Sequence, residues 1–166
     1  MGSTKRTNGI VIKGGYDMKF IADVMLGRLA RWLRILGYDT LYDSNYTDDE
    51  LFFRAHRQKR VLLTRDSDLA HRMNPKYCCF IVEPAVQEQV KQVVVQYQLN
   101  TTDNIFSRCT LCNEPIKPIK KPLVNGRVPE FVYNSVNEFY CCKGCDKIYW
   151  AGSHIKLVKE VLSKLQ

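Results

Sequence analysis

The sequence lacks a long hydrophobic run, since no apolar stretch in its 166 residues approaches the roughly 20 that a membrane helix needs. Residues 1–17 have no apolar core of signal-peptide length, and we expect them to be an N-terminal extension or leader. We therefore expect an intracellular, cytoplasmic protein with no membrane partner. No G-x-G-x-x-G follows the first apolar run and no G-x-x-x-x-G-K-[ST] occurs, which argues against a Rossmann-like nucleotide enzyme.

The composition is that of a folded, basic protein. The hydrophobic fraction is 45%, enough for a packed core, and the net charge is +8. Residues 1–100 carry 15 basic and 11 acidic side chains and residues 101–166 carry 10 and 6, so each part has a net charge of +4. The charge favours an anionic partner, although solubility accounts for an even distribution equally well.

Apolar runs alternate with helical patterns over residues 18–100. We expect strands at 19–22, 39–42, 61–63 and 78–82, helices at 26–36, 47–58 and 84–98, and another helix after the third strand. Gly37 is placed to end the first helix, and Thr47 and Glu50 form a capping-box pattern. This order predicts an α/β fold with a parallel sheet and helices on both faces.

The pattern changes near residue 100. Four of the six prolines fall in residues 100–130, where no long periodic segment occurs. Short β runs follow at 131–133 and 138–141, and a helical pattern closes the chain at 155–165. We therefore expect one domain over residues 18–100 and a second, smaller domain over residues 101–166.

The second part carries two C-x-x-C pairs, separated by 29 residues: Cys109 with Cys112 and Cys142 with Cys145. Two such turns can direct four sulfurs at one ion, which is typical of a closed structural zinc site, whereas redox pairs usually occur singly. We assign Cys142 rather than Cys141 to the site. Gly144 supports this choice, because such turns often need a residue that tolerates positive φ.

Acidic residues follow the expected strands. Asp23 follows the first strand and Asp66 the third, within the segment L-L-T-R-D-S-D. Because the carboxyl ends of parallel strands meet at one edge, these acids would repel each other unless a divalent cation, magnesium or manganese, lay between them. Helix capping is the alternative role for Asp48 and Asp68, and Asp39 and Asp43 are better explained as turn residues.

The segments L-G-R-L-A-R-W-L-R-I-L-G-Y-D, L-L-T-R-D, C-T-L-C-N and C-K-G-C-D-K-I-Y-W-A-G-S-H are distinctive. Together they resemble the RNase domain at the C-terminus of the mutator-seven exonucleases, which is also found as a free-standing protein. The resemblance spans about residues 18–155 and includes the zinc-ribbon tail. It implies a PIN-like nuclease fold over residues 18–100 and metal-dependent cleavage of RNA.

The resemblance also implies roles for individual residues. The acids that match the family are Asp23, Asp48, Asp66 and Asp68, as catalytic residues that hold magnesium or manganese. Arg28, Arg31 and Arg65 match its arginine pattern as RNA contacts, and Arg34 could instead pair with an acid. Asp146 stands where the family usually has glycine. Lys117, Lys120, Lys121 and Arg127 form either an RNA-facing surface or a solvated loop.

The expected protein is therefore a Mg- or Mn-dependent endoribonuclease that hydrolyses RNA phosphodiester bonds and uses a structural zinc ribbon to help bind RNA. Ribosomal and transfer RNA are the candidate substrates. The alternative is a non-catalytic RNA- or ribosome-binding module with an inherited acidic cluster. Cleavage that depends on a divalent metal separates the two.

Overall fold

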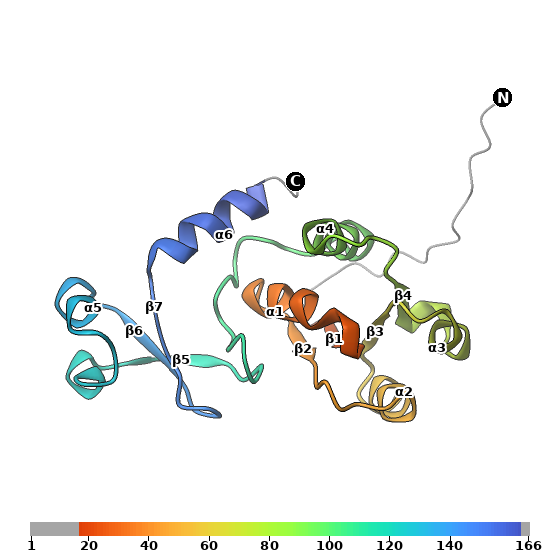
Figure 1. Cartoon of the computed structure of the whole chain (residues 1–166), viewed down its shortest axis with the longest axis horizontal. Coiled ribbons are helices and arrows are strands. Elements are labelled where there is room, and N and C mark those ends of the chain that lie inside the picture. Colours follow the sequence, from red (N-terminus) through yellow and green to blue (C-terminus); the bar gives the residue numbers. More distant parts are fainter. Residues whose placement is uncertain (1–16, 164–166) are drawn as a thin grey trace.

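The computed structural model describes residues 17–163, which contain one parallel sheet and one smaller antiparallel sheet (Figure 1). The parallel sheet has the order β2-β1-β3-β4. Its strands are β1 (Lys19–Ala22), β2 (Asp39–Leu41), β3 (Val61–Thr64) and β4 (Cys78–Phe80). All four residues of the central strand β3 are buried, as expected for a strand covered on both faces. The four strands were predicted from the sequence, with ends that differ by at most two residues.

Helices cover both faces of this sheet. They are α1 (Gly27–Ile35), α2 (Asp48–Arg57), α3 (Ser67–Arg72) and α4 (Val86–Tyr97), with short 3-10 turns η1 (Val24–Leu26) and η2 (Pro75–Tyr77). Alternate strand residues point to opposite faces, so Phe20 packs with the core under α1 and α4, whereas Ile21 packs with the core under α2 and α3. The predicted α/β fold with helices on both faces is confirmed.

Two helix ends follow the expected chemistry. Thr47 accepts the backbone N–H of Glu50 while the Glu50 carboxylate accepts that of Thr47, which completes the capping box of α2. Gly37 has φ +93° just after α1, and a side chain there would collide with the Asn104 carbonyl, 2.4 Å from an added Cβ. Glycine is therefore required at position 37 for two reasons, the positive φ and the close approach of the backbone at Asn104.

The smaller sheet belongs to the cysteine-rich part, called the zinc ribbon below (residues 108–150). It has the antiparallel order β5-β6-β7, formed by β5 (Ile116–Ile119), β6 (Phe139–Cys142) and β7 (Ile148–Trp150). Between β5 and β6 lie η3 (Lys121–Val124) and α5 (Glu130–Ser135). A small core packs between these elements and contains Val124, Val132, Phe139 and Ile148.

The strand predicted at residues 131–133 is wrong, because these residues lie within helix α5. Phe131 is exposed and Val132 is buried, an alternation that a short strand and a short helix can share. The strand that pairs with β6 on this side is β5, which the sequence did not predict. Pro129 at the start of α5 fixes a backbone angle compatible with a helix and donates no hydrogen bond.

The last helix, α6 (Ser153–Ser163), runs from the end of β7 back toward α4 (Figure 1). Leu162 is buried in the core beneath α1 and α4, and Val158 packs against that core. The predicted helix at 155–165 is confirmed up to residue 163, and residues 1–16 and 164–166 lie outside the described part of the chain. Among residues 17–163, no helix is both long and apolar enough to cross a membrane.

Candidate active site and metal centre

The parallel sheet has a switch point between β1 and β3. From β1 the chain enters β2 on one side and then crosses to β3 on the other, so the connections diverge at these two strands. Ligands of open α/β sheets bind outside the carboxyl ends of the strands at such a point. Asp23 directly follows β1, and Asp66 comes two residues after β3.

Asp23 is held rigidly at this edge. Only 5% of its surface is exposed, and its backbone N–H donates to the carbonyl of Leu63 in the neighbouring strand. One carboxylate oxygen accepts the backbone N–H of Val24, and the other accepts the hydroxyl of Thr64 at 2.7 Å. These donors offset part of the cost of burying a charged carboxylate.

Asp66 is half-buried and caps helix α3. Its Oδ1 accepts the backbone N–H groups of Asp68 (2.7 Å) and Leu69 (2.9 Å), whereas its Oδ2 accepts no hydrogen bond from the described residues 17–163. The sequence had offered Asp68 as a cap. The structure assigns the cap to Asp66, because its extended backbone places the carboxylate in front of the first turn.

Thr64 connects the two acids, and the sequence analysis gave it no role. Its hydroxyl donates to Asp23 and accepts the backbone N–H of Asp66 at 2.9 Å. Thr64 is fully buried at the end of β3. A hydroxyl at the end of an otherwise apolar run was the available signal, because a buried polar side chain needs partners.

The other two predicted acids lie further out. Asp48 is exposed in the first turn of α2, where Thr47 serves as the cap, and Asp68 is exposed in the first turn of α3. Nearby, Asp49 forms an exposed ion pair with Arg72 at 2.6 Å. Within residues 17–163, no three acidic side chains bring their oxygens as close together as the four sulfurs described below. The structure thus brings Asp23 and Asp66 together through Thr64 and leaves Asp48 and Asp68 outside that group.

Three arginines suited to phosphate lie on exposed surface. Arg28 and Arg31 occupy the exposed side of α1, which begins beside Asp23, and Arg65 is exposed next to Asp66. None of the three side chains forms a hydrogen bond or ion pair with another residue in the described range 17–163. Their guanidinium groups are therefore available to an external anion.

The four predicted cysteines converge. The sulfurs of Cys109, Cys112, Cys142 and Cys145 all lie within 4.8 Å of one another. This set of four thiol ligands fits one tetrahedral zinc ion, the usual metal of closed sites of this kind. Cys141 lies outside the group, and its thiol is directed to the backbone of Cys142 and to Asp146. The choice of Cys142 over Cys141 therefore agrees with the geometry.

The turn geometry differs from the prediction. Positive φ falls on Asn113 (72°) and Asp146 (58°), each directly after the second cysteine of its pair, and not on Gly144. Asparagine and aspartate tolerate this conformation better than most residues, which explains how Asp146 serves where glycine is usual. Gly144 is needed for space instead, because an added Cβ would stand 2.9 Å from Glu114 and 3.3 Å from the Cys112 sulfur.

The thiol of Cys109 loses its proton more readily than an ordinary cysteine. Burial raises the pKa of Cys109, but hydrogen bonds from the backbone N–H of Cys112 and the hydroxyl of Tyr149 outweigh burial and lower it to about 6. Burial and the neighbouring sulfurs raise the pKa of Cys112 to about 12. A cysteine that is already a thiolate near neutral pH suits a metal ligand, because ligation requires loss of the proton.

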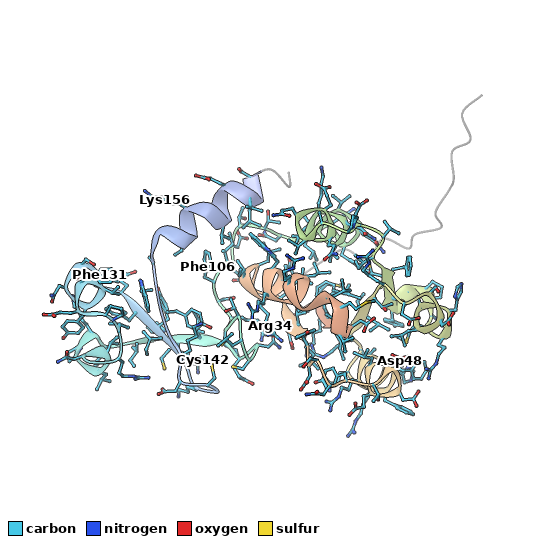
Figure 2. All side chains as sticks on the ribbon, in the orientation of Figure 1. Arg34, Asp48, Phe106, Phe131, Cys142 and Lys156 are labelled. Atoms are coloured by element: carbon cyan, nitrogen blue, oxygen red, sulfur yellow. The ribbon has the colours of Figure 1, made fainter. Side chains whose placement is uncertain are left out.

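The turn between Cys109 and Cys112 contacts the part of the chain that forms the parallel sheet and its helices, called the sheet domain below. Arg34 makes this contact. The guanidinium donates to the carbonyl oxygens of Thr40 (2.9 Å), Thr110 (3.1 Å) and Leu111 (2.8 Å), two of which lie between Cys109 and Cys112. The prediction that Arg34 pairs with an acid is therefore wrong, because its partners are backbone carbonyls. In Figure 2, Arg34 lies between Asp48 on the sheet domain and Cys142 on the zinc ribbon.

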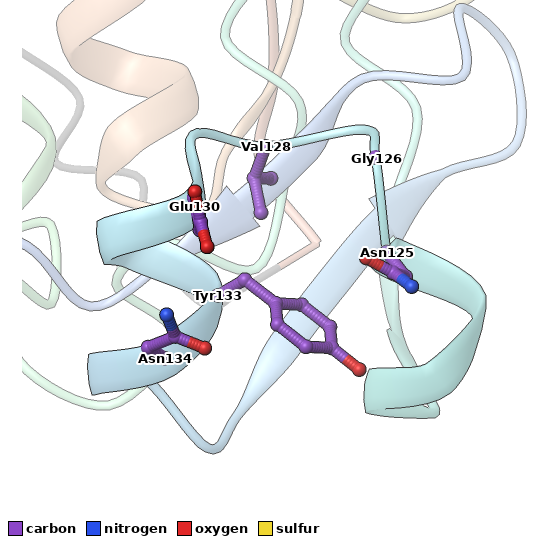
Figure 3. A pocket seen from close by; sticks show the side chains of 6 residues that line it. All are labelled: Asn125, Gly126, Val128, Glu130, Tyr133 and Asn134. Carbon is purple, nitrogen blue, oxygen red and sulfur yellow. The ribbon is translucent and has the colours of Figure 1, made fainter.

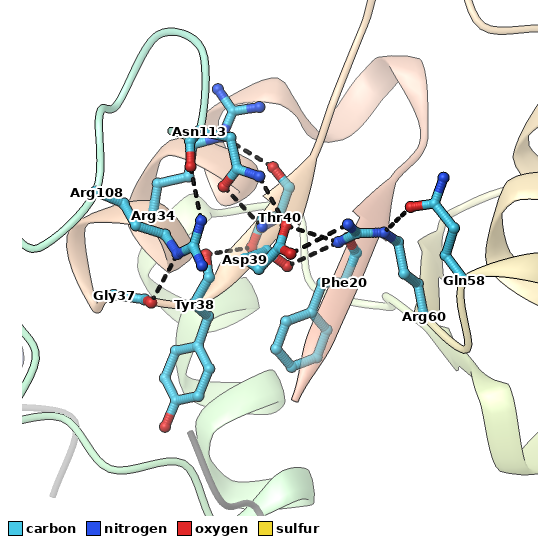
Figure 4. A network of polar contacts seen from close by, with 10 residues as sticks. All are labelled: Phe20, Arg34, Gly37, Tyr38, Asp39, Thr40, Gln58, Arg60, Arg108 and Asn113. Carbon is cyan, nitrogen blue, oxygen red and sulfur yellow. Dashed lines mark hydrogen bonds and ion pairs between the residues drawn. The ribbon is translucent and has the colours of Figure 1, made fainter. Parts of the chain in front are cut away.

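A second set of polar contacts extends this interface (Figure 4). The side chain of Asn113 accepts the backbone N–H of Thr40 and donates to Asp39, which forms an ion pair with Arg60 at 2.7 Å. Burial disfavours the charged form of Asp39, but the hydrogen bonds from Arg60 and Asn113 outweigh burial and lower its pKa. Arg108 bonds the carbonyls of Gly37 and Asn113, so both parts of the chain share one continuous network.

The fold and these groups define an α/β protein with two acids, Asp23 and Asp66, at a sheet switch point and a ribbon whose four cysteines could hold zinc. The model of the Mut7-C RNAse domain family matches residues 18–162, nearly the whole chain, and the chain belongs to that family. A search of the curated proteins finds no match. Membership in an RNase family supports a nuclease-like function with RNA as the substrate or partner.

Proposed function

We propose that this protein is a divalent-metal-dependent endoribonuclease that hydrolyses RNA phosphodiester bonds. The observation that carries the proposal is the placement of Asp23 and Asp66, joined through Thr64, at the switch point of the parallel sheet in a chain of an RNase family. Carboxylate oxygens are the ligands that magnesium and manganese prefer. When bound, such an ion would supply positive charge against the phosphate and lower the pKa of water toward neutrality.

The chain's own residues would position the reaction. The carboxylate of Asp23 is buried and held in one orientation by its two hydrogen-bond donors. Asp66 would contribute its Oδ2, because its Oδ1 already accepts hydrogen bonds from the start of α3. Thr64 would hold the Asp23 carboxylate in a constant position relative to the backbone of Asp66. In this proposal Asp48 and Asp68, at the starts of α2 and α3, contribute at longer range, directly or through water.

The arginines and the ribbon would bind the substrate. Arg28, Arg31 and Arg65 are exposed and would contact phosphates, which set affinity without specifying sequence. A zinc ion held by the four cysteines would fix the ribbon, whose small core is insufficient to fold alone. Ribosomal and transfer RNA remain the candidate substrates, and thiol ligands suit the reducing conditions inside a cell.

A non-catalytic RNA-binding module is the second candidate. Asp48 and Asp68 are exposed and do not cluster with other acids in the described part of the chain, which favours this candidate. Among residues 17–163, Asp23 and Asp66 then have no further acidic side chain close by to complete a metal site. Cleavage of a mixed RNA pool by zinc-saturated protein, with and without manganese, separates the two functions. Manganese-dependent cleavage that disappears in Asp23→Asn supports the nuclease, and RNA binding without cleavage supports the module.

A further inference from the structure

The zinc ribbon contains a cleft at the end far from the parallel sheet, where α5 and η3 lie (Figure 1). Its volume is about 370 Å³, within the range of about 300–1,000 Å³ found for small-molecule sites. The residues that line the cleft are Asn125, Gly126, Val128, Glu130, Tyr133 and Asn134 (Figure 3). The site thus combines one aromatic ring with amides and a carboxylate.

The aromatic ring is that of Tyr133, which is half-buried on α5. The ammonium group of Lys121 lies over the ring, 5.2 Å from its centre, so one face of the ring carries a cation. Lys121 is not among the residues that line the cleft, and a base would stack on the other face of the ring. An aromatic ring with a cation close by can bind a nucleotide through base stacking and phosphate attraction together.

The chain segment that precedes the cleft-lining helix α5 is basic. Residues 115–129 carry four basic side chains and no acidic one, and Lys117 and Lys120 among them are exposed. Arg127 is engaged in an ion pair with Asp146 at 2.8 Å. Glu130 is the one charged residue among those that line the cleft, and its carboxylate would repel a phosphate. Phosphates are therefore favoured outside the cleft, and an uncharged group with N–H donors is favoured inside it.

We propose that this cleft binds one unpaired nucleobase of an RNA strand, stacked on Tyr133 with its donor edge toward Glu130 and the two asparagines. The proposal rests on the proposed RNA-directed function and identifies single-stranded RNA as the form that the ribbon holds. A base inside a duplex cannot enter, because both of its faces are already stacked. Arg28 and Arg31 on α1, between the acids and the ribbon interface at Arg34, provide contacts for the strand along the way.

The test measures affinity for a dye-labelled single-stranded RNA and for the matching duplex, with zinc-loaded full-length protein and no magnesium or manganese. Tyr133→Ala should weaken single-strand binding about fivefold or more, because one base–aromatic stack is worth about 1–3 kcal/mol. Duplex binding should not change. Tyr133→Phe should restore single-strand binding, and Phe131→Ala, which removes an exposed ring of the same helix outside the cleft lining, should have little effect.

Asn134→Leu serves as a second variant in case Tyr133→Ala disturbs folding. It fills the cleft from an exposed position and leaves the ring and the charges in place. Unchanged single-strand binding in Asn134→Leu, or an equal loss in Phe131→Ala, would overturn the proposal. Cleavage is assayed separately with manganese, so an inactive protein that still shows the Tyr133 effect rejects the nuclease and keeps the cleft. An active protein without that effect rejects only the cleft.

Discussion

Arg34 donates a 2.8 Å hydrogen bond to the carbonyl oxygen of Leu111, which lies 77 residues later in the chain and between two of the four clustered cysteines. Arg34 is only 4% exposed, and burial lowers the pKa of its guanidinium. A buried cation with carbonyl partners is costly to disturb, since each carbonyl that loses its donor keeps its desolvation cost. The bond therefore couples the cysteine centre to the sheet domain energetically.

Arg34→Met should lower the free energy of unfolding by about 3 kcal/mol, because carbonyls at the interface lose their donor. Urea unfolding of zinc-loaded protein measures this change. Arg31→Met is the matched control, since Arg31 is an exposed arginine of the same helix. Equal stability of the two variants would show that the Arg34 contacts contribute little.

Asp23→Asn and Asp66→Asn should each reduce manganese-dependent cleavage by orders of magnitude, because each removes a charged oxygen ligand. Asp66→Asn should preserve stability, since asparagine is also a good N-cap for α3. Asp66→Ala should in addition lose about 1 kcal/mol of stability with the cap. Gel-based cleavage and thermal melting test both effects. Full activity of both asparagine variants would eliminate the proposed site.

Cys142→Ser should abolish zinc binding, whereas Cys141→Ser should retain roughly one zinc ion per chain. The reason is geometric, because the Cys142 sulfur belongs to the group of four and the Cys141 sulfur does not. Metal analysis of freshly purified protein decides the matter, with circular dichroism as the check on folding. The reverse pattern would reassign the fourth ligand to Cys141.

The Asp39–Arg60 pair should make stability depend on pH. The pKa of Asp39 is lowered in the folded chain, so its contribution is complete above the ordinary aspartate value of about 3.9 and is lost as pH falls through the lowered value. Asp39→Asn should therefore melt at a lower temperature than the unaltered protein at pH 7. The gap should narrow on acidification below about pH 4, and a constant gap between neutral and acidic pH would contradict this assignment.

Arg28→Ala combined with Arg31→Ala should weaken RNA binding across sequences and reduce its salt dependence by roughly one unit of slope per lost phosphate contact. Titrations at several salt concentrations provide the slopes. Arg57→Ala with Lys91→Ala is a charge-matched control, because both residues are exposed on other helices. An equal fall in slope for the two double variants would mean that only net charge matters.

Local sequence predicted the parallel sheet well because its two inner strands, β1 and β3, are short, mostly buried apolar runs and the segments between strands have clear helical patterns. Chain direction then placed Asp23 and Asp66 at one edge without knowledge of any contact. The role of Thr64 escaped notice because its hydrogen bonds depend on pairing between β1 and β3. Sequence spacing alone did not indicate which strand ends would be neighbours.

The second part of the chain was harder to predict. The cysteine spacing identified the four sulfurs, since two short turns determine most of that geometry. Residues 131–133 were assigned to a strand because three residues carry too little periodicity to distinguish it from the helix that forms. Two of the three carbonyl partners of Arg34, Thr110 and Leu111, come from a turn more than 70 residues away, which no local pattern encodes.

The return of α6 to the sheet domain has a mechanical consequence. The ribbon is attached at its entry, where Phe106 donates to the carbonyl of Ile35 at 2.7 Å, and beyond its exit, where Leu162 is buried in the sheet-domain core. A module on a single tether can swivel, whereas one anchored at both ends and clamped by Arg34 in between resists rotation. An RNA strand bound by the ribbon would consequently reach Asp23 and Asp66 from a constant direction. Its position relative to these two acids would be set before cleavage begins.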